Sequence, residues 1–447
     1  METPNQPLEI YRGGLKLKYK DVTIRGKGRI FVRWLPIPEI WFEMQYCEKC
    51  GIKYPATLTT KGDAINCLLE TGPNQQENCL EVTGVPEIAV RHKKHLFPSK
   101  GKIRAIHMSI KDPDILAGNL SFPQYNGTCN CIKFHLENFK NFGNLRLAEK
   151  EYTLYLDAVN FIRRTDDESN ILDGRMKKTG GFIVTHIGVL KRLDQSAFPL
   201  TDAIIYLNGI YFFASFLSGT WCGPTLAQGF NDEGIVWQDG VPERLTPWTY
   251  ANGCVKGWTA GIEDLFRNFM IQWRDDEKRD AIKNLIQWYV ESNLNAGGTE
   301  GSIILVHSAF LLLANLNGFE ERPAYCRVRR LVKDLGISPE LTSKQENLRL
   351  VYNDNNYKLL TKGKNGKEKP DTWDGPSIFS ELRNAIVHAK DKKDRPLLHK
   401  VPKEAREEAL DLGLWYLELC LLKMLDHKGE YKNRINLKYE MVPWSSQ

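Results

Sequence analysis

Segment 382–388, with the sequence LRNAIVH, brings an arginine, an amide and a histidine together on one short stretch of predicted helix. Asn384 and His388 are four residues apart, which makes them neighbours across one helical turn. Arg383 has a long side chain and a planar guanidinium that fits two oxygens of one phosphate. His388 is suited to moving a proton, and Arg383 to stabilising charge that develops on phosphorus. This pattern predicts metal-free cleavage of a phosphodiester bond.

RNA is the expected substrate, because its ribose 2′-hydroxyl is an internal nucleophile that DNA lacks. His388 would act as the general base on that hydroxyl or as the acid on the leaving oxygen. Asn384 would orient the histidine, bind a phosphate oxygen, or hold two helices in register within a symmetric site. The alternative is a surface helix on which Arg383 and His388 only cap or pair with neighbours. Spacing alone does not separate the two interpretations.

The helix that carries these residues has one apolar arc, which should face a core. Asp374 or Ser377 can cap its start, Pro376 fits its first turn, and it is expected to end at 389–390. The arc consists of Ile378, Leu382, Ala385, Ile386 and Ala389. Val387 lies outside it, where an ordinary surface helix would carry a charge. A second copy of the helix would cover Val387, since a two-fold interface repeats one patch and brings two arginines and two histidines together.

Basic residues flank the same helix in sequence. They are predicted to bind RNA through its phosphates, and the alternative is a set of solvated lysine-rich turns. The formal net charge of +6 fits a phosphate-bearing partner without requiring one. The predicted RNA-binding residues are Lys369 before the helix and Lys390, Lys392, Lys393 and Arg395 after it.

The pattern of Arg383, the polar Asn384, three further residues and His388 matches the Arg-polar-x(3–5)-His signature of the HEPN superfamily. From Gly301 to the C-terminus, including segments 431–434 (YKNR) and 442–444 (VPW), the chain resembles HEPN proteins of bacterial antiphage defence, the ApeA-like group among them. The resemblance is looser in the front part, where it rests on segments 32–36 (VRWLP), 185–188 (THIG) and 216–219 (FLSG).

That resemblance implies a helical bundle that forms a homodimer, with both motifs contributing to one composite ribonuclease site that needs no metal. Many such proteins are toxins that cleave RNA after an infection signal, as antiviral or abortive-infection effectors. Other members have lost activity and serve as dimerisation or nucleotide-binding modules, so the fold does not by itself establish catalysis. All three motif residues are present in this chain.

The front half contains strand-like runs with alternating or β-branched residues, separated by Gly, Pro, Asn and Asp. They occur at 22–35, 40–46, 103–110, 152–161 and 181–190. From about residue 201 an aromatic-rich connector follows, whose tryptophans are read as packing residues and not as base-stacking platforms. These are Trp221, Trp237, Trp248 and Trp258. The front half is therefore predicted to be a predominantly antiparallel β domain.

After residue 260 the hydrophobic period becomes helical. The first stripe is Ile282, Leu285, Ile286 and Tyr289, and the second is Leu414, Leu417, Leu421 and Leu425. Segment 303–316 is nearly all apolar and is predicted to be the central buried helix, with His307 as a packed core histidine. No window is judged long and apolar enough to cross a bilayer. Segment 343–368 is polar and is read as a long excursion or a short hairpin that could hang over the active site.

Ten cysteines in an intracellular chain are read as free thiols. Cys47 and Cys50 have the spacing of a zinc knuckle, and Cys129 and Cys131 with His135 could supply further ligands. The second pair has atypical spacing and the clusters are far apart in sequence. A structural zinc therefore stays an alternative, and no cofactor is expected for catalysis.

The predicted class is α+β, with a β-rich sensing or regulatory region and connector over 1–260 and an α-helical HEPN domain over 261–447. No Walker loop, Rossmann fingerprint or serine-hydrolase elbow is present. The N-terminus has no signal region, which predicts a cytoplasmic protein. The expected function is that of an endoribonuclease whose activity is switched on by a phage-derived or regulatory trigger. The alternative is a non-catalytic dimerisation module whose β domain binds a ligand or partner.

Overall fold

A computed structural model describes the backbone of residues 8–19, 22–33, 39–47, 65–69, 82–87 and 100–110. It also describes, with most of their side chains, residues 127–140, 142–159, 181–238, 244–249, 253–257, 261–321, 324–353, 374–388, 398 and 401–445. Helices and antiparallel sheets are both present in these ranges, so the predicted α+β class is confirmed.

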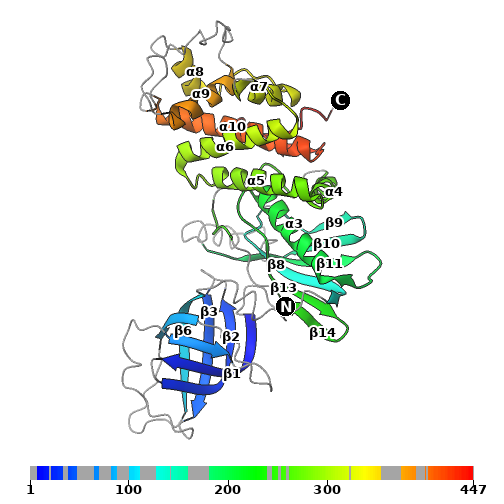
Figure 1. The fold of residues 1–447 in the computed structure, drawn as a ribbon, viewed down its shortest axis with the longest axis vertical. Coiled ribbons are helices and arrows are strands. Elements are labelled where there is room, and N and C mark those ends of the chain that lie inside the picture. The colour runs from blue at the N-terminus through cyan, green and yellow to red at the C-terminus, as the bar shows by residue number, and fades with distance from the viewer. Residues whose placement is uncertain are drawn as a thin grey trace. The chain divides into compact units, whose positions relative to one another are not determined.

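The first six strands close into an antiparallel barrel, in the order β1-β2-β3-β6-β5-β4 (Figure 1). β1 and β2 form a long hairpin in which Tyr19 pairs with Val22 and Leu8 with Val32, with a bulge between Glu9 and Tyr11. Three of the runs predicted from the sequence lie at β2, β3 and β6. The strands are β1 (Leu8–Tyr19), β2 (Val22–Arg33), β3 (Glu39–Cys47), β4 (Ile65–Leu69), β5 (Val82–Glu87) and β6 (Lys100–Ile110).

A second, six-stranded sheet has the order β14-β13-β8-β11-β10-β9. Its pairing is tightest where Gly188 of β11 lies opposite Phe134 of β8, because a β-carbon on Gly188 would fall within the phenyl ring. The runs predicted at 152–161 and 181–190 lie at β10 and β11. The strands are β8 (Cys131–Glu137), β9 (Leu145–Glu149), β10 (Tyr152–Ala158), β11 (Val184–Arg192), β13 (Pro224–Asn231) and β14 (Gly234–Gln238), while β7 (Thr128–Cys129) pairs with β12 (Phe198–Pro199).

The region predicted to be a connector contains a helix, α3 (Leu200–Ser218), and the strands β13 and β14. Gly209 brings α3 close to α4, since a β-carbon at this position would press on Met270 and Trp273. Of the predicted packing tryptophans, Trp221 and Trp237 are buried and Trp248 is half-buried. Trp258 lies outside the described residues.

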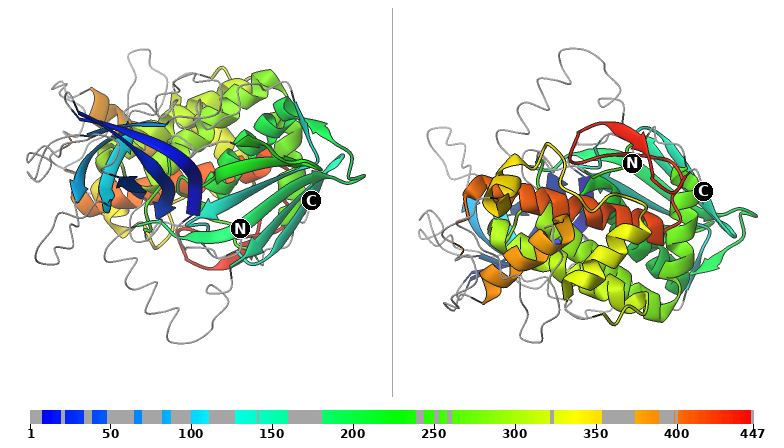
Figure 2. Two further views of the ribbon diagram at one scale, coloured as in Figure 1. Left: turned by 90° about the horizontal axis from the view of Figure 1, so that it is seen from below. Right: turned by 90° about the horizontal axis from the view of Figure 1, so that it is seen from above.

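The helical part has the order α4 to α10, and α5, α6 and α10 lie side by side (Figures 1 and 2). Every residue of the two predicted leucine- and isoleucine-rich stripes is buried, so both stripes are confirmed. The helices are α4 (Ile262–Trp273), α5 (Asp276–Asn293), α6 (Gly298–Leu316), α7 (Ala324–Asp334), α8 (Glu346–Asn353), α9 (Gly375–Val387) and α10 (Lys403–Met424). α8 occupies part of the predicted polar excursion, whose remainder from 354 lies outside the described residues.

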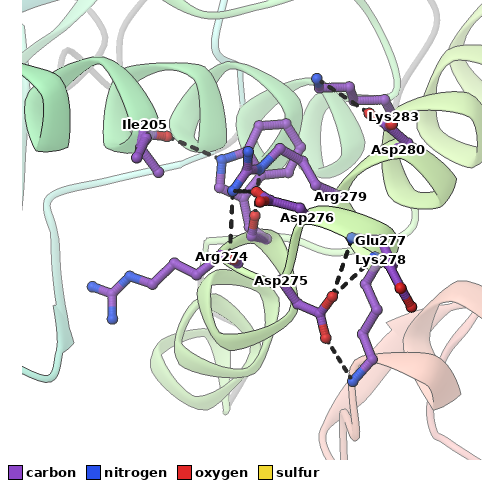
Figure 3. A network of polar contacts seen from close by, with 10 residues as sticks. Ile205, Arg274, Asp275, Asp276, Glu277, Lys278, Arg279, Asp280 and Lys283 are labelled. Atoms are coloured by element: carbon purple, nitrogen blue, oxygen red, sulfur yellow. Dashed lines mark hydrogen bonds and ion pairs between the residues drawn. The ribbon is translucent and has the colours of Figure 1, made fainter.

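A network of polar contacts fixes the corner between α4 and α5 (Figure 3). Asp275 caps α5 by accepting hydrogen bonds from the backbone N–H groups of Glu277 and Lys278, at 3.2 and 3.3 Å. Arg279 turns back and donates from Nε to the carbonyl of Trp273 at 2.7 Å. The start of α5 is therefore capped by a side chain.

The chain divides into two compact units. One comprises 1–139, 155–204 and 224–250, and the other comprises 140–154, 205–223 and 251–447. Within the second unit, Arg274 donates to both carboxylate oxygens of the buried Glu149, at 3.0 and 2.5 Å, and Tyr206 donates its hydroxyl to the same carboxylate at 2.7 Å. The pKa of Glu149 is raised above its ordinary value, because the effect of burial exceeds the opposite effect of the Arg274 guanidinium.

A C-terminal hairpin, β15 (Glu430–Lys432) and β16 (Tyr439–Met441), is joined to the helices by Arg434. Its guanidinium donates to Glu418 of α10 at 2.5 Å and to Asn293 of α5 at 2.6 Å. Tyr289 of α5 donates its hydroxyl to Glu418 at 3.2 Å. A single arginine thus connects the hairpin to two helices.

By length and composition alone, the helices α3 and α6 are long and apolar enough to cross a membrane. The expectation that no segment of the chain is long and apolar enough was therefore wrong. Of their most apolar windows, 61% and 44% are buried within the described structure. Core helices of soluble proteins have the same composition, and in α6 residues such as Ile303, Val306 and Phe310 are fully buried. The predicted central buried helix at 303–316 is part of α6.

Candidate active site at the end of helix α9

The start of α9 is fixed by Asp374, one of the two caps that the sequence predicts. Its carboxylate accepts hydrogen bonds from the backbone N–H and the hydroxyl of Ser377, at 3.0 and 2.5 Å. Pro376 occupies the first turn, as predicted. Arg329 of α7 donates from Nε to Asp374 at 2.5 Å and from Nη2 to the Ser377 hydroxyl at 2.6 Å. The cap is therefore tied to the neighbouring helix.

The apolar arc of α9 faces the core. Ile378, Leu382 and Ala385 are buried, and Ile386 is half-buried, while Ala389 lies outside the described residues. Val387 lies off this arc with 43% of its surface exposed, in agreement with the sequence analysis. The described chain therefore presents a β-branched apolar side chain to solvent next to the predicted catalytic residues.

The three motif residues lie together at the C-terminal end of α9. Arg383 is half-buried and donates from Nη1 to the side-chain oxygen of Asn384 at 3.2 Å. His388 is exposed and ends the helix, and its backbone N–H donates to the carbonyl of Asn384 at 2.9 Å. The helix ends at Val387, slightly before the predicted end at 389–390. An exposed imidazole at the end of a helix that also carries a guanidinium can exchange a proton with a ligand that the guanidinium holds.

His307 of α6 is buried, as predicted, but it lies near the motif. Its ring stacks on Phe379 of α9 with centroids 6.3 Å apart. Burial, with smaller effects from the charges of Arg383 and Arg327, lowers the pKa of His307 to about 4. Within the described part of the chain neither ring nitrogen has a hydrogen-bond partner. The prediction of a packed core histidine is therefore confirmed, and a buried polar group without a partner costs about 1–3 kcal/mol.

The basic residues predicted to bind RNA, namely Lys369, Lys390, Lys392, Lys393 and Arg395, all lie outside the described residues. Their role stays a prediction.

The structure describes only some of the candidate zinc ligands. Cys50 and the side chain of Cys47 lie outside the described residues, and among the side chains that are described no group of three metal-binding residues comes together. Cys129 is buried, and its burial, with a smaller effect from Cys131, raises the pKa of its thiol to about 12. That environment favours the protonated thiol, whereas zinc binds the thiolate.

Several polar residues in and around α9 are not evident from the sequence pattern. Arg329 binds the N-terminal cap of α9, Ser380 is buried within the helix, and His307 packs on its Phe379. These residues come from three different helices, so their proximity leaves no spacing pattern. The one available signal was a histidine in an otherwise apolar helix, at position 307.

The site lies in a region that is similar to a known family of proteins. Residues 275–443, which include the motif, match the family model described as the YopA C-terminal domain, and residues 124–251 match the YopA central domain. No solved structure matches the chain. A relative, the "SPbeta prophage-derived uncharacterized protein YopA" of Bacillus subtilis (strain 168), is 22% identical over 451 residues, which cover 99% of this chain and 96% of the relative. These matches name no activity, so the HEPN resemblance stays a prediction. Over both matched regions, and in the same order, the chain is similar in sequence to YopA.

Proposed function

We propose that the chain is a cytoplasmic endoribonuclease of the HEPN type, which cleaves RNA without a metal ion. Arg383 binds the scissile phosphate and stabilises its developing charge, and His388 transfers the proton. The observation that carries the proposal is the arrangement of Arg383, Asn384 and His388 at one helix end, with the guanidinium held by the amide and the imidazole exposed.

The active unit in this proposal is a homodimer. Val387 supports it, since this exposed side chain lies between the two predicted catalytic residues in sequence, where a second copy of α9 would cover it. The helical region is then a HEPN bundle, preceded by a β-rich region that senses a phage-derived or regulatory trigger and restrains the nuclease. The role in antiviral defence rests on the resemblance seen in the sequence.

The test is cleavage of total cellular RNA and of defined single-stranded oligonucleotides by purified protein in EDTA, with and without infected-cell extract as a source of trigger. Wild-type protein is expected to leave 2′,3′-cyclic phosphate ends, and the Arg383→Ala and His388→Ala proteins are expected to be inactive. Arg330→Gln is the matched control, because this exposed arginine of α7 pairs with the nearby loop residue Glu321 and lies over the ring of Phe319. Equal behaviour of wild-type and His388→Ala protein would favour the non-catalytic module.

The dimer is tested separately. Val387→Asp is expected to give a monomer without activity, whereas Leu437→Asp, at a more exposed apolar residue of the C-terminal hairpin, is expected to leave both properties unchanged. Sedimentation gives the oligomeric state. Cleavage by a monomeric Val387→Asp protein would eliminate the composite site and leave a site within one chain.

A further inference from the structure

Helices α6, α7 and α9 enclose a group of buried polar atoms that the described structure leaves without hydrogen-bond partners. His307 and Ser380 are each 2% exposed. Arg327 and Arg383 are half-buried, but the Nε atom of each is fully covered. The unpartnered atoms are both ring nitrogens of His307, the hydroxyl of Ser380 and the Nε atoms of Arg327 and Arg383.

The geometry of α9 places two of these residues on the same arc. Successive helical residues are separated by about 100°, so Arg383 and Ser380 lie between the directions of Phe379 and Ser377. Phe379 faces α6, where it packs on His307 and Phe310. Ser377 faces α7, where it binds Arg329. Arg383 and Ser380 therefore face the space between α6 and α7, and the charges of both Arg383 and Arg327 act on His307.

The atoms gathered there are predominantly hydrogen-bond donors. Each guanidinium Nε–H and the serine O–H can donate, and a neutral imidazole donates from one nitrogen. Of the carboxylates described around these helices, Asp374 pairs with Arg329 and Glu300 with Arg406. Glu321 pairs with Arg330 and also lies close enough to Arg327 for that charge to lower its pKa, while Arg327 donates from Nη1 to Asn315 at 3.3 Å. No ion pair with a carboxylate is described for Arg383, and a buried cation of this kind is stabilised by a bound anion.

We propose that His307, Arg327 and Ser380, together with Arg383, form a binding site for a phosphate group, which extends the motif of α9 inward between the helices. The occupant is a small tetrahedral oxyanion, either a terminal phosphate of an RNA or free inorganic phosphate. The assignment rests on the proposed nuclease in one respect, because Arg383 then contacts both this phosphate and the scissile one.

The protonation state of His307 agrees with such a site. Its pKa of about 4 keeps the ring neutral at neutral pH, so it supplies a donor without adding a third buried positive charge. A bound phosphate dianion would favour the protonated ring, because an opposite charge close by raises the pKa of an imidazole.

The experiment is titration calorimetry of the full chain with inorganic phosphate and with adenosine 3′-monophosphate, at neutral pH and constant ionic strength, using chloride to replace the anion. Arg327→Gln and Ser380→Ala are expected to weaken binding about tenfold each, since each removes a hydrogen bond to a charged group. The matched controls are Arg330→Gln on α7 and Ser308→Ala on α6, whose hydroxyl is bonded to the carbonyl of Ile304. Both controls are expected to bind like wild type.

Binding of inorganic phosphate alone would identify a free-anion site, and tighter binding of the nucleotide would identify an RNA phosphate. Binding that is absent in wild type, or equal in wild-type, Arg327→Gln and Ser380→Ala proteins that fold normally, would overturn the proposal and leave ordered water as the partner of these atoms. His388→Ala separates the two hypotheses, because it should abolish cleavage and retain phosphate binding. Cleavage without phosphate binding would reject this site alone, and phosphate binding without cleavage would reject the nuclease alone.

Discussion

Gly413 of α10 lies directly against the ring of Phe379 of α9, and a β-carbon at position 413 would overlap that ring. The same ring packs on His307 and Phe310 of α6. Phe379 is fully buried in this close-packed core. The position of α9, and with it that of Arg383 and His388, therefore depends on a glycine in a neighbouring helix.

Gly413→Ala is expected to destabilise the protein, although alanine is the better helix former. Helix propensity favours alanine by about 1 kcal/mol, whereas overpacking a rigid core costs about 1–3 kcal/mol. Gly301→Ala in α6 is the control, because its added methyl group meets open space and should stabilise the protein. Urea unfolding measures both, and an equal gain for the two variants would show that α9 and α10 can separate without cost.

Replacing Asp374 by alanine should cost more than replacing another helix cap. The variant removes the cap of α9 and leaves Arg329 without its carboxylate, for a loss of about 2–4 kcal/mol. Asp275→Ala, at the half-exposed cap of α5, should cost about 1 kcal/mol. Thermal unfolding of the two variants tests this ranking. Equal losses would mean that the ion pair with Arg329 adds nothing to the cap.

Stability should fall as the pH is lowered from about 6.5 to about 4, in part through His307. The folded-state pKa of about 4 lies below the ordinary value of 6.5, so in this window the unfolded chain binds a proton that the folded chain does not. The contribution is present above the window and is lost as the pH falls through it, to a total on the order of 3 kcal/mol.

His307→Gln should flatten that dependence, which urea unfolding at a series of pH values measures. His135, whose pKa burial also lowers to about 4, is unchanged in this variant, so the difference between the two proteins isolates His307. An unchanged slope in the variant would mean that His307 titrates alike in the folded and unfolded chains.

Glu418→Gln should destabilise the second unit strongly, because it replaces the nearest carboxylate of the largely buried Arg434, at 2.5 Å, and leaves the more distant one of Asp411, at 3.8 Å. The expected loss is about 2–4 kcal/mol. Glu407→Gln, which breaks the exposed pair with Lys403, should cost less than about 0.5 kcal/mol. Denaturant midpoints compare the two variants, and a small effect at Glu418 would show that Arg434 does not depend on this carboxylate and that Asp411 suffices as its partner.

The helix α9 could be predicted from sequence because its signals are local: a cap at Asp374, a proline in the first turn and an apolar arc that repeats with the helical period. The same holds for the buried stripes of α5 and α10. The approach of His307 and Arg327 to Arg383 could not be predicted, because it depends on how three helices pack. The helix α3 was missed because its dense aromatic and apolar residues show no strong one-sided pattern.

The second unit includes residues 140–154 and 205–223 in addition to the helices after residue 251. The choice of the first residue therefore matters when the helical region is produced as a separate fragment. A piece beginning at Gly261 would follow the boundary that the sequence favours, yet it would lack two residues of the same unit: Glu149, which binds Arg274, and Tyr206, which donates its hydroxyl to Glu149. It would also leave Met270 and Trp273 without the helix that Gly209 brings against them. Such a fragment is expected to be insoluble for reasons unrelated to toxicity, and a soluble one should begin before residue 140.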